Sequence, residues 1–564
     1  RMQSFLVVSA DLPPIPVALT WANLRFALTA VILTVVIALL FVVGTTRRSL
    51  LAAHQRAAHP IEPWWQRSFL DVLLLVPTLY GLYQLRRVGG LHLGIIDNST
   101  LLNNLLLPLV PVLGSLCLGL LALRGLPYLW NGLAAWAART AWRVPVLALR
   151  ALGRQPAIYR GPCLLLILTL SLATVSASLA TTIAGTLRAA LTYQVGAITQ
   201  LQEAAQSTEQ PSTAPGQARA HKDIQKEPRF LFVPVADHLA VPGITAVTRV
   251  GTYHATAQLS GANQAVQLIG LDRLTYPPVV AHFDPAWSGG QSLGALMNLL
   301  ARRPEHVLVS GAMLAQGFKI GDELSAVVTI ANDHRTLVFR IAGTIDLWPG
   351  YYPQDGPLII ANLDDLFDQM GGQYPYDVWI AHTPGVAVST LVQGVRERGM
   401  TVVDSLDGAT LVTAAEGAPQ YQGVVALLGI GVLVAALLTL LGLLVTALIT
   451  AERRASEFGI LRALGLREPQ LAATLLVEYG LLVVASISLG TGSGLLVAYL
   501  VVPSLVVEVG PHPGTPPYPP QIAWGDSLIV YLIFAAALLL AVVSVVSRIR
   551  RLHVFQAVKL GESE

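Results

Sequence analysis

Hydrophobic residues gather in long runs near both ends of the chain, and a stretch of ordinary mixed composition separates the two groups of runs. A helix that crosses a membrane needs about 20 mostly apolar residues. Runs that reach or approach this length predict seven spans: 26–45, 68–85, 101–123, 163–187, 424–449, 473–502 and 527–547. The second run is the weakest, because it contains Asp71 and Pro77. The pattern predicts an α-helical transmembrane bundle.

The stretch between the fourth and fifth runs predicts a mixed α+β domain carried on two helical stalks. Helical periodicity continues through 188–206 as the first stalk, a polar loop follows at 207–228, and 404–423 leads back as the second stalk. Alternating apolar positions predict strands at 230–235, 244–250, 253–259, 265–270, 306–310, 323–331, 335–346 and 358–361. Helices are predicted at 292–302, 311–317, 363–370 and 386–398.

The distribution of Lys and Arg predicts the orientation of the spans, because cytoplasmic segments carry an excess of these residues. Eighteen of them lie in four segments: 46–67, 124–162, 450–472 and 548–564. The opposite segments hold only three: 1–24, 86–100 and 503–526. The first group is predicted to be cytoplasmic, which places the α+β domain and the start of this chain outside and the C-terminus inside.

The overall composition supports a membrane protein. Hydrophobic residues make up 54% of the 564 positions and charged residues only 12%, whereas a soluble domain has about 25% charged residues. This balance argues against a soluble enzyme and excludes a disordered chain. The two cysteines, Cys117 and Cys163, lie inside apolar runs and predict neither a disulfide framework nor a cysteine metal site.

Similar units stand at the two ends of the chain. Trp21 is followed by an apolar run and by Arg47 after 26 positions, and Trp524 is followed in the same way by Arg550. An aromatic residue at one interface and arginines at the other anchor a span. We therefore expect residues 1–60 to be the end of a first half whose beginning lies outside this chain.

The segment after the fifth run carries the most specific motif. It reads A-E-R-R-A-S-E-F-G-I-L-R-A-L-G from Ala451, and Glu478 follows in a Leu-rich stretch. This motif resembles the cytoplasmic hallmark of the FtsX/MacB-like ABC transporter permeases, of the mechanotransmission type with ten spans. The resemblance implies a helix that couples to an ATPase through these residues: Glu452, Arg453, Arg454, Glu457, Phe458, Gly459, Arg462 and Gly465. Gly465 and Pro469 suit the end of one helix and the start of the next.

The resemblance also implies partners and a location. ATP and Mg would be bound by a separate ABC ATP-binding subunit, in two copies, and this chain would hold no cofactor. A second permease half or copy, and a periplasmic adaptor, lipoprotein or hydrolase, are further expected partners. The protein is expected as a multi-pass protein of the bacterial inner or cytoplasmic membrane.

These expectations divide the chain into consecutive parts. They are 1–60, the last span and basic tail of a first half; 61–124, a two-span hairpin; 125–162, a basic linker with an amphipathic helix; 163–206, a span and first stalk; 207–403, the MacB-like core domain; 404–449, the second stalk and a span; 450–472, the coupling segment; 473–547, two spans; and 548–564, a tail.

Motifs for chemistry within this chain are missing from the sequence. No G-x-x-x-x-G-K-[ST] occurs, so ATP hydrolysis is not expected here, and neither a catalytic, a metal nor a nucleic-acid site is predicted. Gly490 and Gly494 favour close helix packing over a ligand. Asp71 and Glu478 are ionisable residues within predicted spans, with either a structural or a transport role.

Three functions remain open at this point. The first is a permease for export or extraction of a hydrophobic, lipid-like or peptide substrate. The second is a signalling permease that activates an external cell-wall hydrolase and translocates nothing. The third is an ATP-independent carrier or receptor, which would tolerate changes in residues 453–465.

Overall fold

The computed structural model describes residues 64–87, 91–92, 106–139, 143–154, 156–204, 206–207, 230–259, 261–330, 333–453, 468–506, 512, 514–525 and 527–536. They form two compact units. The helical unit draws on residues up to Ala184, on Gly417–Val506 and on residues from Pro519 onward. The α/β unit comprises Gly185–Glu416 and Val507–Tyr518.

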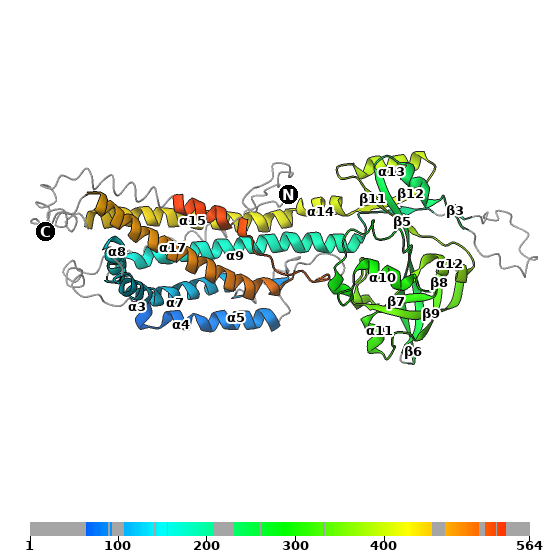
Figure 1. Cartoon of the computed structure of the whole chain (residues 1–564), viewed down its shortest axis with the longest axis horizontal. Coiled ribbons are helices and arrows are strands. Elements are labelled where there is room, and N and C mark those ends of the chain that lie inside the picture. Colours follow the sequence, from blue (N-terminus) through cyan, green and yellow to red (C-terminus); the bar gives the residue numbers. More distant parts are fainter. Residues whose placement is uncertain are drawn as a thin grey trace, which may run out of the picture. The chain divides into compact units, whose positions relative to one another are not determined.

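Helices of very different lengths make up the helical unit (Figure 1). They are α3 (Trp64–Arg67), α4 (Leu70–Leu73), α5 (Leu75–Arg87), α7 (Leu106–Ala137), α8 (Arg143–Arg154), α9 (Pro156–Val195, of which the part from Gly185 belongs to the other unit), α15 (Pro419–Arg453) and α17 (Glu468–Val501), joined by a shorter apolar helix at Ser527–Ala536. A short parallel pair, β1 (Leu91–His92) with β13 (Leu505–Val506), and the 3-10 turn η4 (Val502–Ser504) complete it.

Among the described residues, four helices are long and apolar enough to cross a membrane: Leu109–Ala137, Tyr159–Val195, Tyr421–Gly442 and Leu476–Ser504. They correspond to the predicted spans 101–123, 163–187, 424–449 and 473–502. The predicted span 26–45 lies outside the described residues, and 527–547 is described only as far as Ala536. The number of spans therefore stays a prediction.

The predicted span 68–85 differs from one straight apolar helix. It is made of α4 and α5, and α4 begins after Phe69, whose φ of 50° is left-handed. Large apolar side chains point outward along one stripe: Phe69, Val72, Leu73, Val76, Leu79, Tyr80 and Tyr83. Asp71, Thr78 and Leu85 face inward and are buried. An apolar exterior around a more polar interior is what a lipid-facing helix requires.

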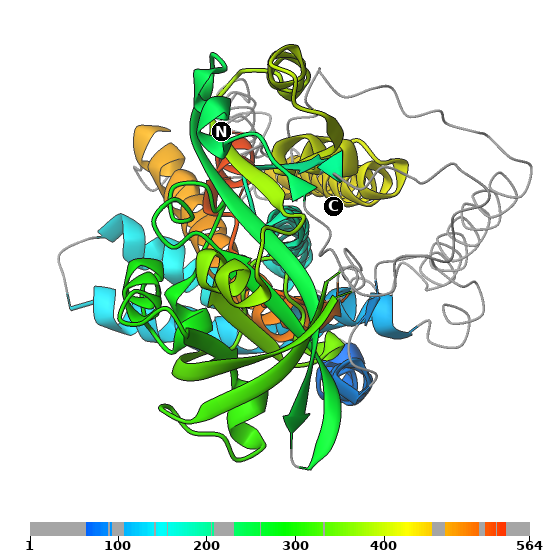
Figure 2. The ribbon, with the colours of Figure 1, turned by 90° about the vertical axis from the view of Figure 1, so that its right-hand side faces the viewer.

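The α/β unit is built around a closed barrel (Figures 1 and 2). Its six strands pair in a ring in the order β5 (Ile244–Leu259), β6 (Ala262–Leu271), β10 (Leu358–Asn362), β7 (His306–Ser310), β9 (Asp333–Ile345) and β8 (Glu323–Ile330), and β8 pairs again with β5. Alternate residues face the interior; along β5, Tyr253, Ala255 and Ala257 are buried while Thr252, His254 and Thr256 are exposed. Closure leaves these strands without an open edge.

The long strand β5 also carries a second sheet. Its first half pairs with β11 (Asp377–His382), which pairs with β2 (Thr199–Glu203), and β12 (Val402–Asp407) forms the edge. Smaller elements surround the two sheets: β3 (Gln206–Ser207), β4 (Phe230–Leu231), η1 (Val235–Ala240), η2 (Pro285–Ser288), α10 (Leu293–Leu300), α11 (Gly311–Ala315), η3 (Pro353–Asp355), α12 (Leu363–Met370), α13 (Val388–Glu397) and α14 (Gly408–Glu416).

Most predicted elements of this unit are present, and some are corrected. The strands predicted at 244–250 and 253–259 are a single strand, β5, and only Phe230–Leu231 of the strand predicted at 230–235 is a strand. The helix predicted through 188–206 ends at Val195, because Thr199–Glu203 pairs with both β11 and β12 as a strand. The stalk predicted from 404 begins only at Gly408, after β12. Both stalks therefore start from neighbouring strands, β2 and β12, of the same sheet.

Candidate coupling site

The last turn of α15 and the start of α17, which flank the predicted coupling segment in the sequence, lie at the same end of the helical unit (Figure 1). The backbone of Glu452 and Arg453 forms the last turn of α15, and α17 begins at Glu468, next to Pro469. Proline is tolerated in the first turn of a helix because it needs no intrahelical N–H bond there. The other predicted coupling residues lie outside the described residues: Arg454, Glu457, Phe458, Gly459, Arg462 and Gly465.

The amphipathic helix α8 lies at the same end and packs against α7 and α17. Ala148, Leu149 and Leu152 form its buried face, whereas Arg150 is exposed. Spacing of three and four residues places the buried positions on one side of a helix. The resemblance had indicated an amphipathic helix in this region, and α8 is that helix.

Helix α9 is the most buried of the long helices. The buried share of its most apolar window is 72%, against 44% for α7 and for α17 and 11% for α15. Its otherwise apolar surface carries several buried hydroxyl groups: Thr169, Ser171, Thr174, Ser176, Ser178 and Thr182. Hydroxyl groups buried in a bundle connect helices by hydrogen bonds.

Two of these hydroxyls join α9 to helices on different sides. Thr169 Oγ1 lies 2.5 Å from Thr439 Oγ1 in α15. Both hydroxyls also lie within reach of the carbonyl of Ala435 in α15, Thr439 at 2.8 Å and Thr169 at 3.5 Å. Ser171 Oγ donates to Ser115 Oγ in α7 at 2.9 Å. A single turn of α9 is thus bonded to both α15 and α7.

Tyr531 joins α9, α17 and the short apolar helix. Its hydroxyl accepts a hydrogen bond from Thr491 Oγ1 at 2.7 Å and lies 3.3 Å from Thr174 Oγ1. Nearer the coupling end, Cys163 Sγ lies 3.2 Å from Ser486 Oγ, which links α9 and α17 again. Helices α7, α15 and α17 therefore each have a polar contact with α9.

The two glycines predicted to pack lie directly against α9. A Cβ atom at Gly490 would be 3.0 Å from the carbonyl oxygen of Ile167, and one at Gly494 would be 2.8 Å from that of Ser171. Side chains do not fit at such distances, so glycine lets the backbones of α17 and α9 approach. Gly492, between them, has no atom of another residue within 4 Å of its Cβ position.

Asp71, the first predicted intramembrane carboxylate, is paired. Its Oδ2 accepts a hydrogen bond from Arg124 Nη1 in α7 at 2.8 Å, and its side chain is fully buried. The guanidinium also lies 4.7 Å from the centre of the Phe69 ring. The ion pair joins the two helical segments of the predicted hairpin 61–124, which indicates a structural role for this carboxylate.

Glu478, the second predicted intramembrane carboxylate, lies in α17 and is 1% exposed. Tyr479 and Leu482 of the bundle core are close to it in the sequence. The sequence suggested a pair with an arginine of the coupling segment. That pairing stays a prediction, because the side chains of Arg453, Arg454 and Arg462 lie outside the described residues.

In the α/β unit, the starts of the two stalks are bonded to each other. Thr199 Oγ1 donates to Asp407 Oδ1 at 2.8 Å, and Gly408 N donates to the carbonyl of Ile198 at 3.3 Å. Farther along the helices, Arg188 of α9 and Glu416 of α14 form an ion pair at 2.8 Å. The ends of both stalk helices and both adjoining strands thus form one connected group.

Asp407 is the central acceptor of this group. Its Oδ2 accepts hydrogen bonds from the backbone N and the hydroxyl of Thr410, which also caps the start of α14. Burial alone would raise the pKa of the Asp407 carboxyl, but the bonds from Thr410 and Thr199 hold that pKa below its usual value.

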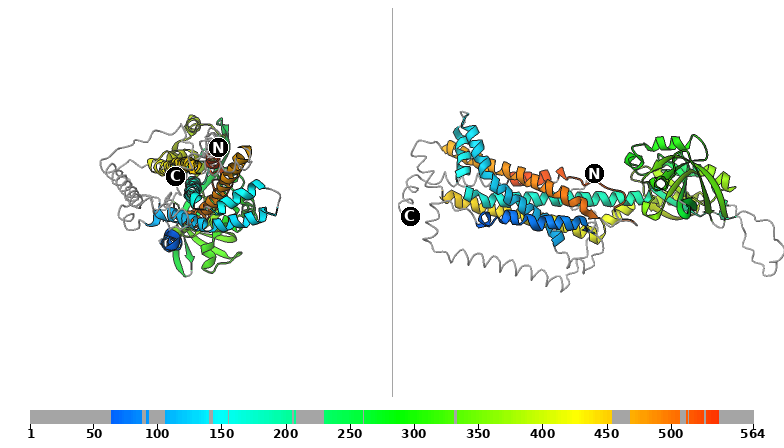
Figure 3. Two further views of the ribbon diagram at one scale, coloured as in Figure 1. Left: turned by 90° about the vertical axis from the view of Figure 1, so that its left-hand side faces the viewer. Right: turned by 90° about the horizontal axis from the view of Figure 1, so that it is seen from below.

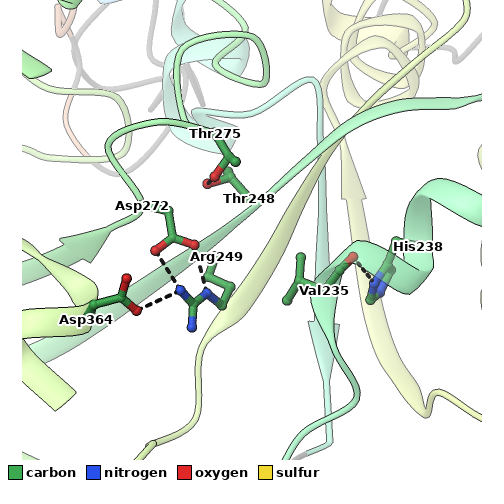
Figure 4. A network of polar contacts seen from close by, with 7 residues as sticks. All are labelled: Val235, His238, Thr248, Arg249, Asp272, Thr275 and Asp364. Atoms are coloured by element: carbon green, nitrogen blue, oxygen red, sulfur yellow. Dashed lines mark hydrogen bonds and ion pairs between the residues drawn. The ribbon is translucent and has the colours of Figure 1, made fainter. Parts of the chain in front are cut away.

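A second polar network lies on β5 and η1 (Figure 4). Arg249 binds both oxygens of Asp272, at 2.7 and 2.8 Å, and also Asp364. Burial would lower the pKa of the Arg249 guanidinium, but hydrogen bonds to Asp272 raise it. His238 Nδ1 contacts the carbonyl of Val235 at 3.0 Å. Asp272 and Asp364 neutralise the charge of Arg249 within this cluster. The bond to Asp364 connects β5 to the start of α12.

Sequence reasoning missed the hydroxyl contacts of α9 and the junction at Asp407. The signal for the first was present, since Ser and Thr recur inside the apolar run 163–187 and such residues face other helices. Asp407-Gly408 before an apolar helix was also a visible start signal. Among the described residues, no group of three His, Cys, Asp or Glu side chains could hold a metal ion.

Comparison with known proteins gives a family for the C-terminal part. The FtsX-like permease C-terminal family matches residues 429–554, which include most of α15, the predicted coupling motif and α17. No curated protein matches the chain.

Solved structures similar to part of the chain include two extracytoplasmic domains. One is the periplasmic region of MacB from Actinobacillus actinomycetemcomitans, with 10% identity and a TM-score of 0.24 over 40% of this chain and 94% of that one. The other is the extracellular domain of the ABC-type transporter YknZ from Gram-positive bacteria, with 11% identity and a TM-score of 0.20 over 30% and 87%. The family match shows that residues 429–554 of this chain are similar to the C-terminal part of FtsX-like permeases.

Proposed function

We propose that this permease transmits ATP-driven motion from a separate subunit to an extracytoplasmic α/β unit, in order to export or extract a hydrophobic, lipid-like or peptide substrate. The observation that carries the proposal is the position of α9. This one helix has polar contacts with α7, α15, α17 and Tyr531, and it continues without a break to Val195.

The proposed input is the segment between α15 and α17. An FtsX-type permease works with an ATP-binding partner, and we place the docking contact at residues 452–465. Arg453, Arg454, Glu457 and Arg462 would supply charged contacts and Phe458 an apolar anchor, while Gly459 and Gly465 permit close approach. ATP and Mg would be held by that partner, in two copies.

The proposed path from there uses the contacts of α15. Because Thr439 binds Thr169, a displacement of α15 acts on α9 at a buried point. In the α/β unit, α9 and α14 are bonded through Arg188 and Glu416, so the two stalk helices would move together. The strands β2 and β12 that follow them are neighbours in one sheet.

The proposed location follows from the arginine distribution of the sequence. The coupling segment, α8 and the C-terminal tail would be cytoplasmic, and the α/β unit would lie outside a bacterial inner or cytoplasmic membrane. The domain boundaries predicted from the sequence form part of this proposal.

The test is the variant Phe458→Asp, with the ATP-binding subunit co-expressed. We expect loss of co-purification or of substrate-stimulated ATP turnover, because an aromatic anchor contributes on the order of 2 kcal/mol, about thirty-fold in affinity. Leu274→Asp is the matched control, since Leu274 is an apolar side chain of the α/β unit that is 77% exposed.

Two results would change the proposal. Unchanged co-purification and turnover in Phe458→Asp and in Glu457→Lys would favour an ATP-independent carrier or receptor. Coupled turnover without movement of any substrate would favour activation of an external hydrolase.

A further inference from the structure

The C-terminal end of α7 and the helix α8 project sideways from the other helices of their unit. Figure 2 shows both in cyan beside the bundle, and the two views of Figure 3 agree. We call residues 125–139 and 143–154 the lateral hairpin. Helix α7 has 32 residues and is about 48 Å long at 1.5 Å per residue, whereas the hydrocarbon core of a bilayer is about 30 Å thick. The helix α7 is therefore longer than is needed to cross the hydrocarbon core, and its C-terminal end extends beyond that length.

The α7 part of the lateral hairpin has two different faces. One face packs into the bundle core and is buried: Leu126, Trp130, Ala134 and Ala137. The other is exposed although it is apolar and aromatic, with exposed fractions of 78% for Tyr128, 50% for Leu129, 37% for Leu133 and 65% for Trp136. The exposed positions follow a helical spacing of three and four residues, so they form one stripe.

The charges of this region have one sign. Residues 124–162 contain six arginines and no Asp, Glu or Lys. Arg124 is engaged by Asp71, whereas Arg139 and Arg150 are exposed. Trp and Tyr favour the level of the lipid headgroups, and arginines near the cytoplasmic leaflet are attracted to its anionic lipids.

We propose that the lateral hairpin lies in the headgroup layer of the cytoplasmic leaflet and binds anionic phospholipids. Tyr128, Leu129, Leu133 and Trp136 enter the boundary of the acyl chains, and Arg139 and Arg150 bind lipid phosphates. A lipid surface fits better than a protein partner for two reasons. The stripe is the C-terminal part of a helix, Leu109–Ala137, that is apolar enough to cross the membrane, and an amphipathic segment with an apolar outer face suits the membrane interface.

The test measures which lipid is adjacent to the stripe in the full chain. A bimane fluorophore is attached at Gly132→Cys, an exposed position with no other residue within 4 Å of its Cβ site; the natural Cys117 and Cys163 are buried, and the unchanged chain serves as the labelling blank. The chain is placed in phosphatidylcholine vesicles that contain either brominated phosphatidylglycerol or the same amount of brominated phosphatidylcholine. We expect several-fold stronger quenching by the phosphatidylglycerol.

Two controls separate binding from simple proximity. The double change Arg139→Glu and Arg150→Glu should remove the preference for phosphatidylglycerol but keep quenching by both lipids. The same fluorophore at Leu433→Cys, an outward position of α15 that is 59% exposed, should be quenched equally by both lipids in either background.

Three results would overturn the proposal. They are no quenching at position 132 by either lipid, equal quenching by both lipids in the unchanged arginine background, or protection of the fluorophore by the ATP-binding subunit. The last would assign the lateral hairpin to that protein partner. None of them bears on Phe458, so the proposed function is tested separately.

Discussion

The hydroxyl oxygen atoms of Thr169 in α9 and Thr439 in α15 lie 2.5 Å apart, and both side chains are almost fully buried. This contact stands out because α15 is otherwise exposed: only 11% of its most apolar window is buried. The helix that leads into the proposed docking segment is therefore held to the centre of the bundle at a specific polar point.

Removing this contact should weaken the attachment of α15. Thr439→Val keeps the shape of the side chain and deletes the hydroxyl, so Thr169 loses its short bond to α15 and keeps only the longer contact with the carbonyl of Ala435. We expect the chain to lose about 0.6–2 kcal/mol of stability, as for hydrogen bonds between membrane helices, and ATP turnover to respond less to substrate. Thermal unfolding in detergent and the turnover assay measure the two effects.

Ser488→Ala is the matched control for that variant, because Ser488 is exposed in α17 and its hydroxyl donates to the carbonyl of Val484 in its own helix. It should change neither stability nor turnover. Equal losses in Ser488→Ala and Thr439→Val would show that the contact between α9 and α15 has no special role.

Close packing of α17 on α9 gives a second prediction. Gly494→Ala places a Cβ atom 2.8 Å from the backbone oxygen of Ser171, so the two helices must separate. We expect a loss of about 1–3 kcal/mol, the usual cost of overpacking, visible as a lower unfolding temperature in detergent.

Gly492→Ala provides a control two residues away, where the added methyl group meets no other residue. Because alanine favours a helix by about 1 kcal/mol over glycine, this variant should be neutral or more stable. A larger loss in Gly492→Ala than in Gly494→Ala would contradict the observed packing.

Elements with a clear local period could be predicted from the sequence. Strand β8 alternates because one of its sides faces the barrel interior, and four of the predicted spans are long apolar helices. One prediction was wrong: strands were expected at 244–250 and at 253–259, yet a single strand, β5, runs through both ranges and through Gly251 between them. The side chain of Tyr253 occupies the space where a side chain at Gly251 would lie, which is a reason for glycine within a strand.

Features that depend on distant partners could not be predicted. The segment Thr199–Glu203 is polar and has no strand pattern of its own, and it becomes a strand because β11 and β12 bind its two edges. The sequence likewise marks Thr169 and Ser171 as polar residues within a span, but it does not say that one reaches α15 and the other α7. Asp71 was predicted as an intramembrane carboxylate, whereas its partner, Arg124, lies 53 positions away.

The pair of Asp71 and Arg124 predicts that removing the cation alone destabilises the protein more than removing both charges. Arg124→Ala leaves a fully buried carboxylate without its cation, which costs about 3–5 kcal/mol. Asp71→Ala with Arg124→Ala removes both charges and should be less harmful than Arg124→Ala alone. Unfolding temperatures of the single and double variants form the cycle, with Arg67→Ala, an exposed arginine of α3, as control; additive losses would argue against a buried pair.

The junction at Asp407 predicts a dependence on pH. Hydrogen bonds from Thr410 and Thr199 hold the pKa of the Asp407 carboxyl below its usual value, so the folded state binds the proton less readily than the unfolded state. The stability that this group contributes is then fully present above the unfolded pKa of about 3.9 and is lost as the pH falls through the folded pKa.

We expect the amides of β12 and α14 to exchange hydrogen faster as the pH falls below about 4, after correction for intrinsic exchange. In Asp407→Asn, exchange should already be faster at neutral pH and should show less further change in acid. Asp404→Asn alters an exposed carboxyl on the same strand and should keep the acid response. An acid response that persists unchanged in Asp407→Asn would assign it to another carboxyl, and the junction between the two stalks would then lack its proposed central acceptor.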